Sequence, residues 1–274
     1  MALHWNKKFQ PGMAYVMLSR TQTLDDIYIV ESKSQFATEA IKVNPDALEE
    51  SERIHASFLD SQMKKELMFT NCLTMSYLNV RRLLPHLPDV STDNVLMKSD
   101  IVALGETWLK PSENIELAGY QSVHVKSEEG GKGLSVFVKS GIKFNHQEYH
   151  GDRFSLILLQ LVNIDIAFVY LSKGFNWIVF KEVLEQFIHT HKNIAVIGDT
   201  NIDILSENHN LIDYLLEKSF VQIVQQPTHE HGGLLDHIYI NVSLQKKYPF
   251  CAQTAVYYSD HDIVSLHVPD EYFE

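Results

Sequence analysis

The feature that most constrains the fold is a series of short apolar runs that begins near Phe69 and continues towards the C-terminus. Short apolar runs bounded by turn residues are typical of buried strands. We expect strands at 73–80, 101–104, 134–138, 194–197, 221–224, 237–240 and 263–268, and a strand pair within 155–170 that turns at 163–165. Helical spacing occurs after Asn176, the expected N-cap, and at 211–216. This alternation predicts an α/β class fold, a four-layered α/β sandwich in which two packed mixed β-sheets are flanked by helices.

The chain has 274 residues, enough for one large or two small domains. Three regions differ in composition. Residues 1–31 hold a loop and a short apolar run, and residues 32–67 are polar and charged, so we interpret them as a linker with a solvated helix. Residues 68–274 carry the strand signals and are expected to form the main domain.

Charge and cysteine content narrow the functional classes. The formal net charge of -12 argues against sequence-blind binding to nucleic acid through a broad basic face. It does not exclude a nuclease, because a metal-binding site must itself be acidic. The only cysteines are Cys72 and Cys251, which suits a reducing compartment. DNA contact would have to come from local cations such as Arg81, Arg82, Lys126, Lys132 and Arg153.

Neither a signal peptide nor a membrane span is expected from the sequence. Residues 1–10 are polar and do not resemble a signal peptide, and Gln160, Asn163 and Asp165 interrupt the longest apolar stretch, 154–171. We therefore expect a monomer that is nuclear or cytoplasmic rather than secreted, with no membrane partner.

Polar side chains recur where an apolar run begins or ends, which is where a rigid scaffold presents groups to a cleft. Each one alone is also a common turn former, so a single case indicates little. The combination is much harder to attribute to turns. The residues concerned are Asn79, Glu106, Asp199, Asn201, Asp236, Asp260 and His261.

These residues lie in motifs that resemble those of the endonuclease/exonuclease/phosphatase family, in the family's order. The form Glu106-Thr107-Trp108-Leu109 is similar to that of endonucleases of non-LTR retrotransposons. The other motifs are Tyr77-Leu78-Asn79-Val80-Arg81, Gly198-Asp199-Thr200-Asn201, Leu235-Asp236-His237-Ile238 and Ser259-Asp260-His261. The third position of the Gly-Asp-x-Asn motif is Thr200, where many members have an apolar or aromatic residue.

The resemblance implies a site for Mg²⁺ or Mn²⁺. Glu106 and Asp260 would be hard oxygen ligands, and Asn79 would support the same ion or a phosphate oxygen. Whether one or two metals act stays open.

The resemblance also implies catalytic roles. Asp199 would orient or deprotonate the attacking water, with Asn201 fixing its position. His261 would donate hydrogen bonds to the phosphate, and Asp236 would hold the His261 imidazole in one tautomer. Tyr170 would contact the phosphate, although Leu171-Ser172-Lys173-Gly174 replaces the usual proline-rich continuation.

Segment 9–20, from Phe9 to Arg20, resembles the last conserved motif of Pif-type superfamily-one helicases. There the residue matching Arg20 reaches the ATP γ-phosphate. The chain has no phosphate-binding Gly-x-x-x-x-Gly-Lys-Ser/Thr loop, so this segment cannot hydrolyse ATP alone. A helicase tail followed by a nuclease resembles the proteins of Helitron-type transposons, and a missing helicase portion is one expected partner. An incidental match of a strand-turn segment is the alternative.

Two further features receive ordinary interpretations. Gly130-Gly131-Lys132-Gly133 lacks the spacing of a nucleotide-binding loop and predicts a turn. His229-Glu230-His231 follows Pro227 and does not have the spacing of a helical zinc-ligand pair, so a solvated or substrate-facing loop is expected.

The sequence therefore predicts a divalent-metal-dependent phosphodiesterase, first of all a DNA endonuclease that nicks DNA as part of a mobile element. Two alternatives remain open. One is a phosphatase of the same fold acting on inositol lipids, sphingomyelin or RNA ends. The other is a catalytically inactive remnant of a truncated transposon protein that only binds a partner or nucleic acid.

Overall fold

The structure is a computed structural model that describes residues 2–4, 28–30, 72–126, 132–190, 192–206 and 209–270. The chain divides into two units, Met1–Leu67 and Met68–Glu274. In the first unit, strands β1 (Ala2–His4) and β2 (Tyr28–Val30) pair in parallel. The helicase-like segment with Arg20, the linker 32–67 and residues 130 and 131 of the predicted turn lie outside the described residues.

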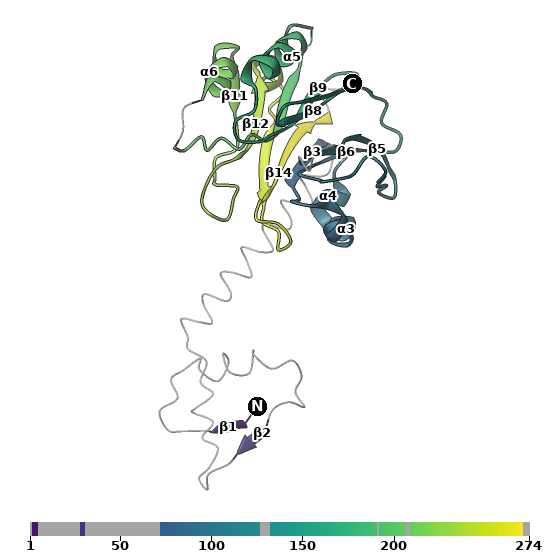
Figure 1. Ribbon diagram of the computed structural model, residues 1–274, viewed down its shortest axis with the longest axis vertical. Helices are drawn as coiled ribbons and strands as arrows, with labels where there is room; N and C mark the ends of the chain where they lie inside the picture. Colours follow the sequence, from purple (N-terminus) through teal and green to yellow (C-terminus); the bar gives the residue numbers. More distant parts are fainter. Residues whose placement is uncertain are drawn as a thin grey trace. The chain divides into compact units, whose positions relative to one another are not determined.

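The second unit is built on two six-stranded mixed sheets (Figure 1). The first sheet has the order β13-β14-β3-β4-β6-β5. Strands β3 and β4 run parallel at its centre, and β14 lies antiparallel to β3. Its strands are β3 (Cys72–Asn79), β4 (Ile101–Gly105), β5 (Tyr120–Val125), β6 (Leu134–Lys139), β13 (Phe250–Thr254) and β14 (Ile263–Pro269).

The second sheet has the order β11-β12-β10-β9-β8-β7. Strands β9 and β10 form its parallel central pair, and β12 lies antiparallel to β10. Its strands are β7 (Asn145–Gly151), β8 (Phe154–Gln160), β9 (Asp165–Leu171), β10 (Ile194–Asp199), β11 (Phe220–Gln222) and β12 (Asp236–Asn241).

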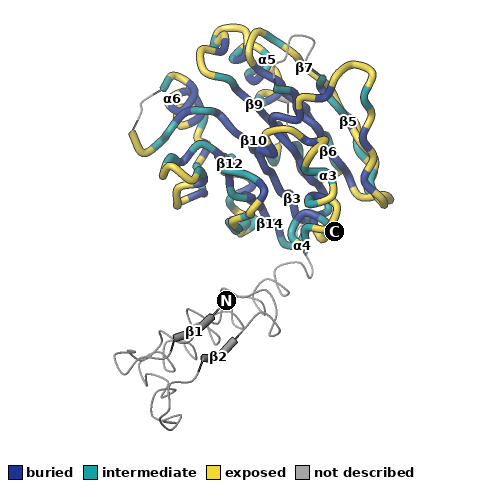
Figure 2. Tube along the Cα trace, turned by 60° about the horizontal axis from the view of Figure 1, so that its bottom comes forward, coloured by how far each residue is buried: buried dark blue, intermediate teal, exposed yellow. Residues whose placement is uncertain are grey.

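The main core lies between the two sheets. Alternate residues of the central strands point into it, as the two-residue period of a strand requires. Met75 and Tyr77 of β3 contribute from one sheet, and Ile166 and Phe168 of β9 contribute from the other. Figure 2 shows these strands as the buried centre of the domain, with exposed residues gathered on the connecting loops.

Helices cover the outer face of each sheet. Helices α5 (Trp177–Thr190) and α6 (Asn210–Glu217) pack with β8, β9 and β10 in a second apolar cluster. Helices α3 (Leu83–Thr92) and α4 (Asn94–Lys98) pack against β3 and β4 in a third cluster, on the other side of the domain (Figure 1). The short helix α7 (Val242–Gln245) follows β12. The predicted four-layered α/β sandwich is thus confirmed.

Several elements were not expected from the sequence. Strand β7 has no buried residue, and it is an edge strand of its sheet. Helix α3 contains Pro85 and Pro88, which suggest a loop in the sequence, yet it forms because Leu83 and Val90 are buried against the sheet. Among the described helices, none has both the length and the apolar character needed to span a bilayer.

Candidate active site

Four candidate residues lie at the ends of their strands. Their side chains point to the same face as the core residues of those strands. Asn79 follows Tyr77 on β3, and Tyr170 follows Phe168 on β9. Asp199 follows Ile197 on β10, and Asp236 precedes Ile238 on the antiparallel strand β12. The two-residue period thus directs these polar side chains into the space between the sheets, where the apolar core stops.

The remaining candidate residues lie on loops at the ends of β4 and β14. Glu106 follows β4 with a left-handed backbone, φ 50°. Asp260 and His261 precede β14, and the Ser259 hydroxyl donates a hydrogen bond of 2.6 Å to the Asn79 carbonyl oxygen. That bond ties the end of β3 to the loop that carries Asp260 and His261.

His261 is buried and paired with a buried carboxylate. Its Nδ1 atom lies 2.8 Å from Oδ2 of Asp236. Burial alone lowers the pKa of His261, but the negative charge and hydrogen bond of Asp236, followed by the charge of Asp199, raise it to about 9. The imidazole is therefore a cationic donor at neutral pH, with Nε2 as its second N–H.

Thr228 fixes the position of Asp236. Its hydroxyl oxygen accepts hydrogen bonds from the backbone N–H groups of Leu235, at 3.1 Å, and Asp236, at 3.0 Å. Thr228 is buried, so these two donors have an acceptor away from water. The start of β12 is thereby held in place beside His261.

Asp199 is fully buried at the centre of the site. One carboxylate oxygen accepts a hydrogen bond of 2.8 Å from the Asn201 backbone N–H. The other accepts from the side-chain amides of Asn79, at 2.7 Å, and Asn201, at 3.3 Å. Burial, and then the nearby charge of Asp236, raise the pKa of Asp199 to about 7. A carboxylate with this pKa is suited to accept a proton near neutral pH.

Glu106 and Tyr170 meet between the two sheets. The Tyr170 hydroxyl donates a hydrogen bond of 2.8 Å to Oε1 of Glu106, and the Lys132 ammonium lies 3.3 Å from the same oxygen. Burial, and then the charge of Glu106, raise the pKa of Tyr170, so the phenol stays a proton-bearing donor. Tyr170 therefore contacts a predicted metal ligand of the other sheet.

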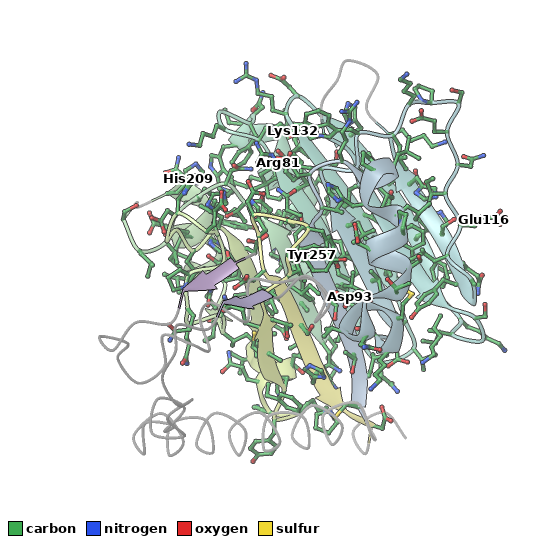
Figure 3. The ribbon with its side chains drawn as sticks, turned by 90° about the horizontal axis from the view of Figure 1, so that it is seen from below. Arg81, Asp93, Glu116, Lys132, His209 and Tyr257 are labelled. Carbon is green, nitrogen blue, oxygen red and sulfur yellow. The ribbon has the colours of Figure 1, made fainter. Side chains whose placement is uncertain are left out.

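Asp260 lies among cationic and aromatic groups. The Arg81 guanidinium contacts Oδ2 of Asp260 at 2.5 Å, and Nε2 of His229 lies 3.6 Å from the same oxygen. The ring centroids of His229 and His261 are 4.7 Å apart, with the rings nearly perpendicular. Figure 3 draws Arg81 and Lys132 in the same region of the domain.

The residues present fit a divalent cation. The Oδ1 atoms of Asp236 and Asp260 are buried without a hydrogen-bond partner among the described residues. Ligand atoms of Asp199, Asp236 and His261 lie within 4.8 Å of one another, as do those of His229, Asp260 and His261. Glu106 and Asp260 each hold a side-chain cation in this structure. Carboxylate and amide oxygens are the donors that Mg²⁺ and Mn²⁺ prefer.

The structure joins the predicted residues into two linked groups. One contains Asn79, Asp199, Asn201, Asp236, Asp260 and His261, and the other contains Glu106 and Tyr170. The side-chain amide of Asn79 donates a hydrogen bond to Asp199, and its expected support of the ion or of a phosphate oxygen stays a prediction. Arg20 lies outside the described residues.

Several residues that complete the site were not among the candidate site residues of the sequence analysis. Thr228 and Ser259 position the candidate residues through backbone hydrogen bonds, and His229 packs on His261. Arg81 and Lys132 were expected only as possible DNA contacts, yet each pairs with a predicted metal ligand. Ser259 and Arg81 lie inside the recognised motifs, which was the only signal available for them.

Comparison with known structures finds the same fold in proteins described as exonucleases and endonucleases. A 3'-5' exonuclease from Neisseria meningitidis superposes with a TM-score of 0.53 at 16% identity, over 71% of this chain and 99% of that one. An AP endonuclease from Archaeoglobus fulgidus gives 0.55 at 19% identity, over 71% and 98%. The endonuclease domain of TRAS1, a telomere-specific non-LTR retrotransposon, gives 0.56 at 12% identity, over 73% and 99%.

At these identities the structural likeness establishes the fold and nothing finer. No curated protein matches the sequence. Residues 71–261, however, match the family described as the Endonuclease/Exonuclease/phosphatase family, and this span holds every described strand-end candidate from Asn79 to His261. The chain belongs to the Endonuclease/Exonuclease/phosphatase family.

Proposed function

We propose that this protein is a divalent-metal-dependent DNA endonuclease that nicks one strand, of the kind that mobile elements use. Family membership supports a metal-dependent phosphodiesterase. The observation that carries the proposal is the pairing of a cationic His261 with Asp236 next to a buried Asp199 whose pKa is near neutral. This arrangement offers a proton acceptor and a proton donor in one cleft.

Hydrolysis of a phosphodiester requires three events: the attacking water loses a proton, the charge of the phosphate is neutralised, and the leaving oxygen gains a proton. Asp199 accepts the proton of the attacking water, and Asn201 holds that carboxylate in place. His261 donates through its second N–H to a phosphate oxygen. A P–O bond forms to the water oxygen, the P–O bond to the leaving oxygen breaks, and the leaving oxygen takes its proton from solvent water.

The ion we propose is Mg²⁺ or Mn²⁺, held by Glu106 and Asp260. Bound there, it would supply positive charge to the phosphate and to the leaving oxygen. Tyr170 donates to Glu106 and fixes the orientation of that carboxylate. Asn79, on the other sheet, donates a hydrogen bond to Asp199. This bond connects the proton acceptor to the sheet that carries Glu106 and Asp260.

DNA as the substrate rests on local charge and on motif form. Arg81 and Lys132 border the site and are exposed enough to reach phosphates, although the whole chain is acidic. The Glu106-Thr107-Trp108-Leu109 form and the helicase-like segment 9–20 support the mobile-element context. We also propose that the helicase portion expected in such proteins acts as a partner.

The test is nicking of supercoiled plasmid by the full chain, with Mg²⁺, with Mn²⁺ and without metal. We expect metal-dependent nicking that His261→Ala and Asp199→Ala each abolish, while Glu116→Gln, which changes an exposed carboxylate elsewhere on the domain, leaves it intact. Release of phosphate from a 3'-phosphorylated oligonucleotide without nicking would instead support the phosphatase alternative. A folded chain that binds metal and does neither would contradict the proposal.

A further inference from the structure

An exposed tryptophan stands on the rim of the site. Trp108 follows Glu106 by two residues, and 43% of its surface is exposed. The Arg82 guanidinium lies 5.7 Å from the centroid of the Trp108 ring, within the range of a cation–π contact. The neighbouring Leu109 is buried and anchors the segment to the core. The ring therefore has a fixed base and a face available to solvent or a ligand.

The backbone around Trp108 is strained, and hydrogen bonds fix its conformation. Left-handed φ values occur at Arg81 (49°), Arg82 (121°), Glu106 (50°) and Trp108 (54°). Such residues cost about 1–3 kcal/mol each and persist where the surroundings fix them, often at ligand clamps. Here the Trp108 N–H donates to the Lys132 carbonyl oxygen at 3.0 Å.

A second backbone bond joins the two loops that carry the contact. The N–H of Leu83 donates to the carbonyl oxygen of Thr107 at 3.0 Å. The segment with Arg82 is thereby tied to the segment with Trp108. The two side chains form a preorganised pair rather than an accidental contact between mobile surface groups.

The chemistry of this rim selects its ligand. It offers one aromatic face beside the cations Arg81, Arg82 and Lys132, in a chain whose net charge is -12. Aromatic faces bordered by cations bind nucleobases attached to a phosphate backbone, and every base has a face that can stack. Within a duplex both faces of a base are covered by its neighbours, so only an unstacked base can use such a platform.

We propose that Trp108 and Arg82 form a stacking platform for an unpaired nucleobase of the DNA strand next to the scissile phosphate. The inference rests on the proposed function and deepens it, because it assigns a preference for DNA that is locally unpaired or easily unstacked. Arg82 covers part of the ring in the free protein and is placed to contact the phosphate of the base that stacks there.

The experiment compares two labelled duplexes, one fully paired and one with a single unpaired nucleotide. Binding is measured by fluorescence anisotropy with the full chain in Mg²⁺, in an Asp199→Asn background that leaves the DNA uncut. We expect Trp108→Ala to weaken binding of the bulged duplex by about 5- to 100-fold and to affect the paired duplex much less. Trp108→Phe should retain most of the affinity.

Tyr248→Ala provides the matched control, because Tyr248 is an exposed aromatic at a left-handed position in the turn between α7 and β13. It should bind both duplexes like the parent. Equal losses on both duplexes, or unchanged binding by Trp108→Ala, would overturn the platform. If the unsubstituted chain nicks plasmid and only this result fails, the proposed function stands. If the unsubstituted chain does not nick DNA and the Asp199→Asn chain does not bind it, both fail.

Discussion

The Nδ1 atom of His261 and the Oδ2 atom of Asp236 are 2.8 Å apart, and both side chains are buried. The second oxygen of Asp236 has no hydrogen-bond partner among the described residues. The charge of this carboxylate acts on the imidazole and also on Asp199. His261 owes its cationic state to Asp236, since burial alone would lower its pKa.

Asp236→Asn is expected to lower the rate of nicking by about 10²- to 10⁴-fold, because the neutral amide no longer raises the pKa of His261. The parent should give a bell-shaped pH–rate profile. Its acidic limb reflects deprotonation of Asp199 at about 7, and its alkaline limb reflects deprotonation of His261 at about 9. In Asp236→Asn the alkaline limb should move to lower pH. An unchanged alkaline limb would show that His261 is not the donor.

Stability without metal should fall as pH rises from about 6.5 to about 9. The pKa of His261 is higher in the folded than in the unfolded chain, so its contribution is fully present below the unfolded value and is lost as pH passes the folded value. The Tm of the unsubstituted chain should therefore fall more over this window than the Tm of His261→Asn does. The difference between the two falls should be at least about 2–4 °C. Thermal unfolding followed by circular dichroism measures both slopes, and parallel slopes would contradict the assignment.

Metal should stabilise the fold through Glu106. At a concentration of Mn²⁺ or Mg²⁺ about 100 times its Kd, a bound ion contributes about 2.7 kcal/mol, or a rise in Tm of about 5–10 °C for a domain of this size. Glu106→Gln should lose most of this rise, because it removes a hard anionic ligand. Glu116→Gln, at an exposed position, should keep it. The same rise in both variants would exclude Glu106 as a ligand.

Gly198→Ala should destabilise the domain more than another left-handed glycine does. Gly198 has φ 153°, and an added Cβ would overlap the backbone carbonyl oxygen of Val169 on β9. Gly119 also has a positive φ, 85°, but its added Cβ would meet nothing within 4 Å. Gly119→Ala should cost about 1–2 kcal/mol, the left-handed penalty alone, and Gly198→Ala about 4 kcal/mol or more. Urea unfolding gives both values, and equal losses would contradict the steric explanation.

The central strands could be predicted because burial on both faces makes them continuously apolar. This holds for residues 101–104 and 194–197, which lie in β4 and β10. Strand β7, with the sequence NHQEYHG, could not be predicted, because an edge strand is specified by its partner β8 and not by its own apolar pattern. Helix α3 could not be predicted either, because its prolines suggest a loop and its helical structure depends on packing against the sheet.

The candidate residues could be located from their positions at strand ends, but their partners could not. The contacts of Arg81 with Asp260 and of Lys132 with Glu106 join residues far apart in the chain. Thr228 looks like an ordinary turn residue until its hydroxyl is seen to accept the N–H groups of Leu235 and Asp236. Local sequence pattern carries no signal for such pairings, since they depend on how the two sheets meet.

The candidate residues Asn79, Tyr170, Asp199 and Asp236 prolong the same rows of side chains that build the core between the sheets. A slip of one residue in any of these strands would turn its polar group to the outer face and send an outward-facing neighbour into the cleft. Loss of nicking activity would then indicate a misaligned strand as well as a missing catalytic group. If a preparation is compact and rich in β-structure but inactive, the alignment of these strands should be checked before the loss of a catalytic group is considered.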